Sequence, residues 1–239
     1  MHLKDDIKTL LEQREFDKLL ELAARKKGVI RYLVSFLYSE DDLLHWRAVD
    51  ALGALAKNPS VLSTEKAHTV ISRLFLNLED QSGGNAWGAI EAVGAMIAVR
   101  PNQLGNEIPK MFSFISDARL WKGLLWSVRR IGEQRPDLLR DKIFHVVGLL
   151  RNPSNTARGH AAWALGAIGD TDVRVLEGLI IDIKETLEGL LDDDSRVRIY
   201  REGELQETTV GDLAKEALAS LNGRQSSTEN IEASIDFCI

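Results

Sequence analysis

The chain has 239 residues, of which 44% are hydrophobic and 28% charged, which is the balance of a folded globular domain or a short repeat array. Thirty Lys and Arg against 36 Asp and Glu give a formal net charge of −6, which argues against a general nucleic-acid binder. The single cysteine, Cys238, excludes a disulfide framework and a zinc site built from cysteines. No run of about 18 apolar residues is present and the N-terminus lacks the plan of a signal peptide, so we expect a cytoplasmic protein without a membrane segment.

An internal repeat organises the sequence. Four eight-residue segments align on a shared last glycine, namely residues 46–53, 87–94, 125–132 and 159–166. Five positions before each glycine stands a small residue, and apolar residues recur at the spacing of one helix face. A glycine inside a helix costs about 1 kcal/mol relative to alanine, so four in register indicate a shared steric need. We expect each glycine-bearing helix to be approached closely by a neighbouring helix.

A second helix is predicted before each of these segments, over residues 29–38, 64–78, 107–115 and 138–150. Prolines at positions 59, 101 and 136 fall where the glycine-bearing helices must stop, and Pro153 falls where a preceding helix must stop. Asp41, Thr64 and Ser154 are predicted to cap helix N-termini. The sequence therefore predicts a stack of α-helical hairpins.

The last repeat is irregular. Residues 195–210 alternate apolar and polar side chains around Glu202-Gly203, which predicts an inserted β-hairpin. An isolated hairpin is only marginally stable, so we expect it to pack on the helices or on a partner. We expect residues 1–222 to form one domain and residues 223–239 a flexible C-terminal tail. The apolar end of that tail either docks back on the helices or is a short binding segment.

Residues 47–56 and 157–170 resemble HEAT repeats, specifically the short variety first noted in phycobilisome lyases. The resemblance covers roughly residues 28–221, and the whole chain is similar to uncharacterised prokaryotic HEAT-repeat proteins. It implies an all-α fold, a right-handed α-α superhelix of about five helical hairpins. It also implies that the second helices line a concave surface used for protein binding.

Tryptophans and charged residues share faces of the glycine-bearing helices. Trp46 and Asp50, like Trp87 and Glu91, are four residues apart and therefore neighbours on one helix face. We predict a binding surface formed by Trp46, Asp50, Trp87, Glu91, Trp126, Arg129, Arg130, His160 and Trp163. The alternative is that the tryptophans pack between helices as part of the core.

Other candidate sites are weaker. Ser82, Gly83 and Gly84 run into a helix and could offer backbone N–H groups to an anion, although an ordinary loop is the simpler interpretation. The five histidines show no metal-binding spacing, and adjacent sequence assembles no catalytic group. We therefore expect no metal, cofactor or catalytic residue.

The repeat architecture without catalytic motifs favours a non-catalytic scaffold or adaptor that binds another protein, itself a monomer or a weak homo-oligomer. Two alternatives stay open. The first is a DNA-binding enzyme, because some solenoids of this kind resemble alkylpurine glycosylases, with Trp126 and the basic residues of 119–158 as the nearest equivalents. The second is a lyase or chaperone subunit for tetrapyrrole attachment, which depends on fold analogy alone.

Overall fold

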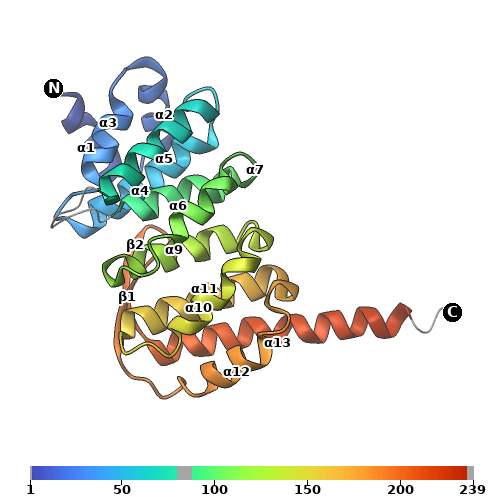
Figure 1. Ribbon diagram of the computed structural model, residues 1–239. Helices are drawn as coiled ribbons and strands as arrows, with labels where there is room; N and C mark the ends of the chain where they lie inside the picture. Colours follow the sequence, from blue (N-terminus) through green and yellow to red (C-terminus); the bar gives the residue numbers. More distant parts are fainter. Residues whose placement is uncertain (1, 80–87, 236–239) are drawn as a thin grey trace. The chain divides into compact units, whose positions relative to one another are not determined.

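A computed structural model describes residues 2–79 and 88–235, which form helices and one two-stranded sheet (Figure 1). The chain divides into two compact units. The first unit contains Met1–Ser127 and Tyr200–Leu205, and the second contains Val128–Ile199 and Gln206–Ile239. The single domain predicted for residues 1–222 stays a prediction.

The first unit is built from helices that pack around one central helix. Its helices are α1 (Leu3–Glu12), α2 (Phe16–Arg25), α3 (Val29–Phe36), α4 (Asp42–Lys57), α5 (Thr64–Glu79), α6 (Ala89–Val99), α7 (Pro101–Leu104), η1 (Gly105–Glu107), α8 (Ile108–Phe112), η2 (Ala118–Leu120) and the first half of α9 (Trp121–Gly132). Helix α4 is central, because α1, α3 and α6 all pack against it. Its side chains are consequently buried on most of its circumference.

The second unit repeats this plan. It contains the end of α9, η3 (Pro136–Lys142), α10 (Ile143–Leu149), α11 (Asn155–Asp172), η4 (Val173–Leu176), α12 (Ile180–Glu188) and α13 (Val210–Ile235). Helix α11 packs along α13, and α10 packs against α11. None of the helices in the described part of the chain combines the length and hydropathy that a membrane span requires.

The aligned glycines are points of close helix approach, as predicted. A Cβ atom placed on Gly53, Gly94, Gly132 and Gly166 would touch, in that order, Ala95, Ser127, Ile168 and Ala217 of the next repeat. At Gly94 this atom would lie 2.2 Å from the Ser127 Cβ, and at Gly166 it would lie 2.8 Å from the Ala217 Cα. Real Cβ atoms do not approach this closely, so both positions exclude a side chain. The repeat of helical hairpins is confirmed within each unit.

Two of the three predicted caps are present. Asp41 accepts two backbone N–H groups of the first turn of α4 at 3.0 Å, and Ser154 accepts one in α11 at 3.4 Å. The prediction for Thr64 is wrong by one residue, because Thr64 begins α5 and the Ser63 Oγ accepts the N–H of Lys66 at 3.3 Å. Both hydroxyls suit a cap, and the helix begins after the first of them.

The inserted hairpin is also confirmed, with β1 (Arg196–Arg201) and β2 (Glu204–Thr209) joined through Glu202 and Gly203. Both turn residues have positive φ, 55° and 86°, as a tight two-residue turn requires. The backbone of residues 223–235 continues α13 as helix, and the flexible tail predicted for residues 223–239 stays a prediction. Gly223 lowers the stability of a helix by only about 1 kcal/mol, and no proline stands beside it to end the helix. Residues 236–239, including Cys238, lie outside the described residues.

Candidate functional site

The predicted tryptophan ladder is packed inside the protein. Trp46, Trp126 and Trp163 are 1%, 2% and 5% exposed, so the alternative of core tryptophans holds for these three. Glycine-bearing helices have neighbours on both sides, and their large side chains therefore fill the space between helices. Four further predicted positions, Trp87 and the stretch of Ser82, Gly83 and Gly84, lie outside the described residues. Binding roles for the remaining positions stay predictions.

In the first unit, two of these tryptophans anchor the tip of the hairpin. Tyr200 stacks on Trp46 with ring centroids 4.9 Å apart, and its backbone carbonyl accepts the Trp126 indole N–H at 3.1 Å. The Tyr200 hydroxyl donates to the Asp50 Oδ2 at 2.5 Å. Burial raises the pKa of Tyr200, and the Asp50 carboxylate raises it further. Asp50 and Trp126 are thus engaged in holding Tyr200, a partner that sequence analysis missed.

In the second unit, the predicted arginines are matched by a nearby carboxylate. Arg129 Nη2 and Arg130 Nη1 lie 2.6 Å and 2.9 Å from the two carboxylate oxygens of Glu133. The Arg129 guanidinium also lies over the Trp163 ring, 4.0 Å from its centroid. His160 is 1% exposed, with Nδ1 2.9 Å from the carbonyl oxygen of Thr156. These groups stabilise the packing of α9 and α11 within the unit.

A cleft of about 350 Å³ in the first unit combines buried and exposed charged groups. We call it the His45–Glu91 cleft. It is lined by Ser39, Glu40, Asp42, His45, Trp46, Glu91, Arg119, Leu120, Lys122 and Gly123. These residues come from the N-terminal ends of α4, α6 and α9 and from the turns before them. Of the predicted surface, Trp46 and Glu91 lie at this cleft.

Two glycines make room for the ionisable groups of the cleft. Glu91 is 6% exposed, and its Oε2 accepts the backbone N–H of Gly88 at 2.9 Å. A Cβ on Gly123 would lie 2.3 Å from the Glu91 carboxylate carbon. A Cβ on Gly88, whose φ is +95°, would lie 2.7 Å from the His45 Cε1. Side chains at either position would displace the groups that line the cleft.

His45 contributes a mostly neutral imidazole. Burial lowers its pKa, while the Glu91 carboxylate has the strongest opposing effect and the Lys122 ammonium adds to the lowering. Asp42 and a hydrogen bond with the Leu37 carbonyl also act to raise the pKa of this histidine, without reversing the effect of burial. Near neutral pH the fixed charges of the cleft are therefore those of its carboxylates, Arg119 and Lys122.

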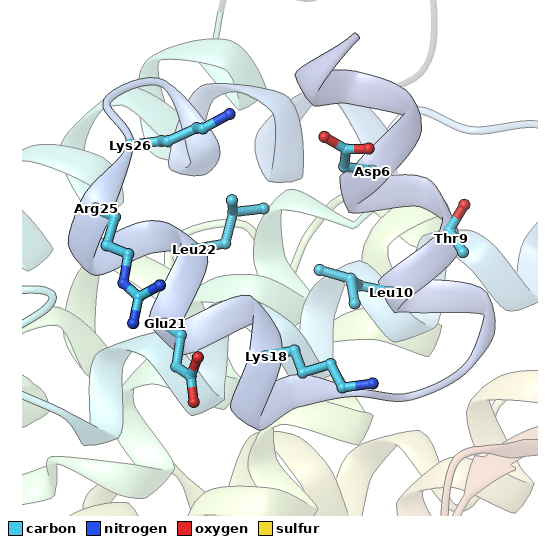
Figure 2. Close-up of a pocket in the computed structure, with 8 residues that line it drawn as sticks. All are labelled: Asp6, Thr9, Leu10, Lys18, Glu21, Leu22, Arg25 and Lys26. Atoms are coloured by element: carbon cyan, nitrogen blue, oxygen red, sulfur yellow. The ribbon is translucent and has the colours of Figure 1, made fainter. Parts of the chain in front are cut away.

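A second hollow lies between α1 and α2 at the start of the chain, with a volume of about 540 Å³. Leu10 and Leu22 project toward one another across it, and Lys18 lies at one end (Figure 2). One oxygen of Asp6, Oδ1, is buried without a hydrogen-bond partner among the described residues. Glu21, Arg25 and Lys26 of this groove are exposed, whereas the His45–Glu91 cleft contains buried ionisable groups.

Comparison with known proteins gives one distant relative, whose description names no activity. No family model matches the chain. A protein of Archaeoglobus fulgidus described as uncharacterized is 26% identical over 195 residues, which cover 77% of this chain and 92% of the relative.

Similar solved structures are helical repeat proteins. A designed armadillo repeat protein in complex with the peptide (KR)4 has a TM-score of 0.48 and 17% identity, covering 92% of this chain and 100% of that chain. The archaeal HEAT-like repeats protein from Thermococcus onnurineus NA1 has a TM-score of 0.33 and 14% identity, covering 93% and 98%. By its own glycine contacts and helix packing, the present chain is likewise a helical repeat protein.

Proposed function

We propose that this chain is a protein-interaction module and that its first unit contacts a polypeptide partner at the His45–Glu91 cleft. The observation that carries the proposal is the position of the Glu91 side chain. It is 6% exposed and lines the cleft. Its carboxylate accepts the backbone N–H of Gly88 and lies where a side chain on Gly123 would be. Burying a charged group is costly unless it is paired. Among the described residues, the Glu91 carboxylate accepts a hydrogen bond at Oε2, and its Oε1 has no hydrogen-bond partner.

The size and construction of the cleft fit a polypeptide. Its volume of about 350 Å³ lies at the low end of the range for small-molecule pockets, about 300 to about 1,000 Å³, so it has room for only a few side chains. Successive repeats supply its walls, and its rim carries exposed side chains such as Glu40 and Arg119. A few side chains of a partner would fill the cleft while the neighbouring residues of that partner contact the rim.

The contacts of Trp126 do not favour the alternative of a DNA glycosylase. Such an enzyme would need an aromatic residue in an open basic groove, whereas Trp126 is 2% exposed and donates its indole N–H to the Tyr200 carbonyl. The cleft also contains three carboxylates, which repel phosphates.

Site-specific photo-crosslinking in the native host tests the proposal. A photoreactive amino acid at Ser39, on the rim of the cleft, should crosslink a partner protein. The same residue at Lys66, exposed on α5 and outside the cleft, should not yield that product.

A second substitution in the Ser39 variant makes the test specific. Gly123→Ala should lower the crosslinking yield, because the new methyl group displaces Glu91. Gly148→Ala is the matched control, since a Cβ there meets nothing within 4 Å. Equal products from Ser39 and Lys66, or a yield unaffected by Gly123→Ala, would contradict the proposal.

A further inference from the structure

The hydrogen-bond donors at the His45–Glu91 cleft are already occupied by carboxylates of the chain itself. Asp41 accepts two N–H groups at the start of α4, and Glu91 accepts the Gly88 N–H before α6. Asp117 accepts the backbone N–H of Arg119 at 3.0 Å. The positive ends of helices attract anions only where such groups are available. An anionic ligand would have to displace three internal carboxylates.

The side-chain charges facing the cleft are unequal. Arg119 is held by Asp117 through two hydrogen bonds, Nε to Oδ1 at 2.9 Å and Nη2 to Oδ2 at 2.7 Å. With that pair set aside, three carboxylates, Glu40, Asp42 and Glu91, face a single ammonium group, that of Lys122. The field in the cleft therefore favours an additional cation.

One cation of the chain itself, the Lys122 ammonium, already lies in the cleft. Its Nζ lies 5.5 Å from the centroid of the Trp46 ring, within the range of a cation–π interaction. It forms no ion pair with any residue in the described part of the chain. Its ammonium group thus shares the cleft with three carboxylates and is bound to none of them.

We infer that the His45–Glu91 cleft binds a lysine or arginine side chain of the partner polypeptide and that Lys122 competes with it for the cleft. The incoming cation lies closer to the Glu91 carboxylate than the Lys122 ammonium does and pairs with it beside the Trp46 ring, and Leu120 contacts the aliphatic part of the side chain. Lys122, which is only partly buried, swings toward solvent. This inference depends on the proposed function, since it names the group that the partner inserts.

The charge of the ligand is tested with two peptides of the same shape. The acetylated and amidated tripeptide Gly-Arg-Gly is titrated into the full-length protein, with the backbone amide signals of His45 and Gly123 followed by NMR. The control peptide carries citrulline, which replaces the guanidinium by a neutral urea group. The arginine peptide should shift both signals in a saturable manner, and the citrulline peptide should bind at least about tenfold more weakly. Equal binding of the two peptides would overturn the inference.

Two substitutions give effects of opposite sign. Lys122→Met should strengthen binding of the arginine peptide about two- to fivefold, because it removes the competing ammonium and keeps the length of the side chain. Glu91→Gln should weaken it about tenfold, because the paired carboxylate is lost. Weaker binding of the arginine peptide by Lys122→Met would contradict the inference. Because Lys122 is partly exposed, this variant tests the inference even if Glu91→Gln fails to fold.

Failure of this inference can be separated from failure of the proposed function. If the Ser39 crosslink forms and Gly123→Ala lowers its yield, while the arginine peptide does not bind, the cleft contacts a partner through a different chemical group. If neither crosslinking nor peptide binding occurs, both proposals are wrong. Titration with inorganic phosphate covers the anionic case, and saturable shifts of His45 and Gly123 with phosphate would refute the cationic assignment.

Discussion

Gly94→Ala should destabilise the protein, although alanine is the better helix former. The substitution gains about 1 kcal/mol of helix propensity. Against this, the new methyl group would lie 2.2 Å from the Ser127 Cβ and 2.8 Å from its Cα, so that α6 and α9 must separate. Overpacking of a rigid core costs about 1–3 kcal/mol, and more where backbone must move. We expect a net loss of about 2 kcal/mol in the free energy of unfolding.

The glycines of the repeat provide an ordered series for the assay, which is urea denaturation followed by circular dichroism. Gly166→Ala should also destabilise, because its Cβ would meet the Ala217 Cα at 2.8 Å. Gly53→Ala should be nearly neutral, since Ala95 is 3.4 Å away, and Gly148→Ala should stabilise by up to about 1 kcal/mol. If Gly94→Ala stabilises the protein as much as Gly148→Ala does, the close approach of repeats at these glycines is refuted.

Three further predictions concern buried polar groups. Tyr200→Phe should lower the free energy of unfolding by about 1–2 kcal/mol in urea denaturation, because the hydrogen bond to Asp50 is lost; an unchanged midpoint would show that this bond adds nothing. Arg100→Met should cost about 2 kcal/mol in the same assay, since the buried guanidinium donates to the Leu62 carbonyl at 2.9 Å; stability equal to the wild type would contradict this. Burial holds the pKa of His45 below its ordinary 6.5, so the unfolded chain binds the proton more readily and stability should fall as the pH drops below that value. His45→Gln should make this loss between about pH 7 and about pH 5 smaller in thermal denaturation, and an unaltered pH dependence would exclude His45 as its source.

The repeat was predictable because its signal is local and recurs. Four glycines in register, each preceded by a small residue, predict close approach of a neighbouring helix. In the structure a Cβ would meet the next repeat too closely at Gly94, Gly132 and Gly166, and would make near-ordinary contact at Gly53. The hairpin was predictable for a similar reason, since Glu202-Gly203 between alternating residues specifies a tight turn. Helix ends were harder to predict, because Ser63 and Thr64 are adjacent and the hydroxyl of either can cap a helix.

The site was less predictable because it depends on contacts between residues distant in sequence. Tyr200 meets Asp50 across 150 positions, and nothing in either segment indicates the other. Gly123 lies outside the aligned octets, and its importance appears only when the Glu91 carboxylate is found against it. The burial of Trp46, Trp126 and Trp163 could not be decided from the sequence, because periodicity identifies which residues share a helix face but not how many neighbours cover that face.

The cleft as the site of contact is tested most directly by hydrogen–deuterium exchange of the full chain, alone and bound to the partner that crosslinking identifies. The account predicts slower exchange on binding in residues 39–46 and 119–123, which form the rim and floor of the His45–Glu91 cleft. Unchanged exchange in both segments, with protection only elsewhere in the chain, would contradict it.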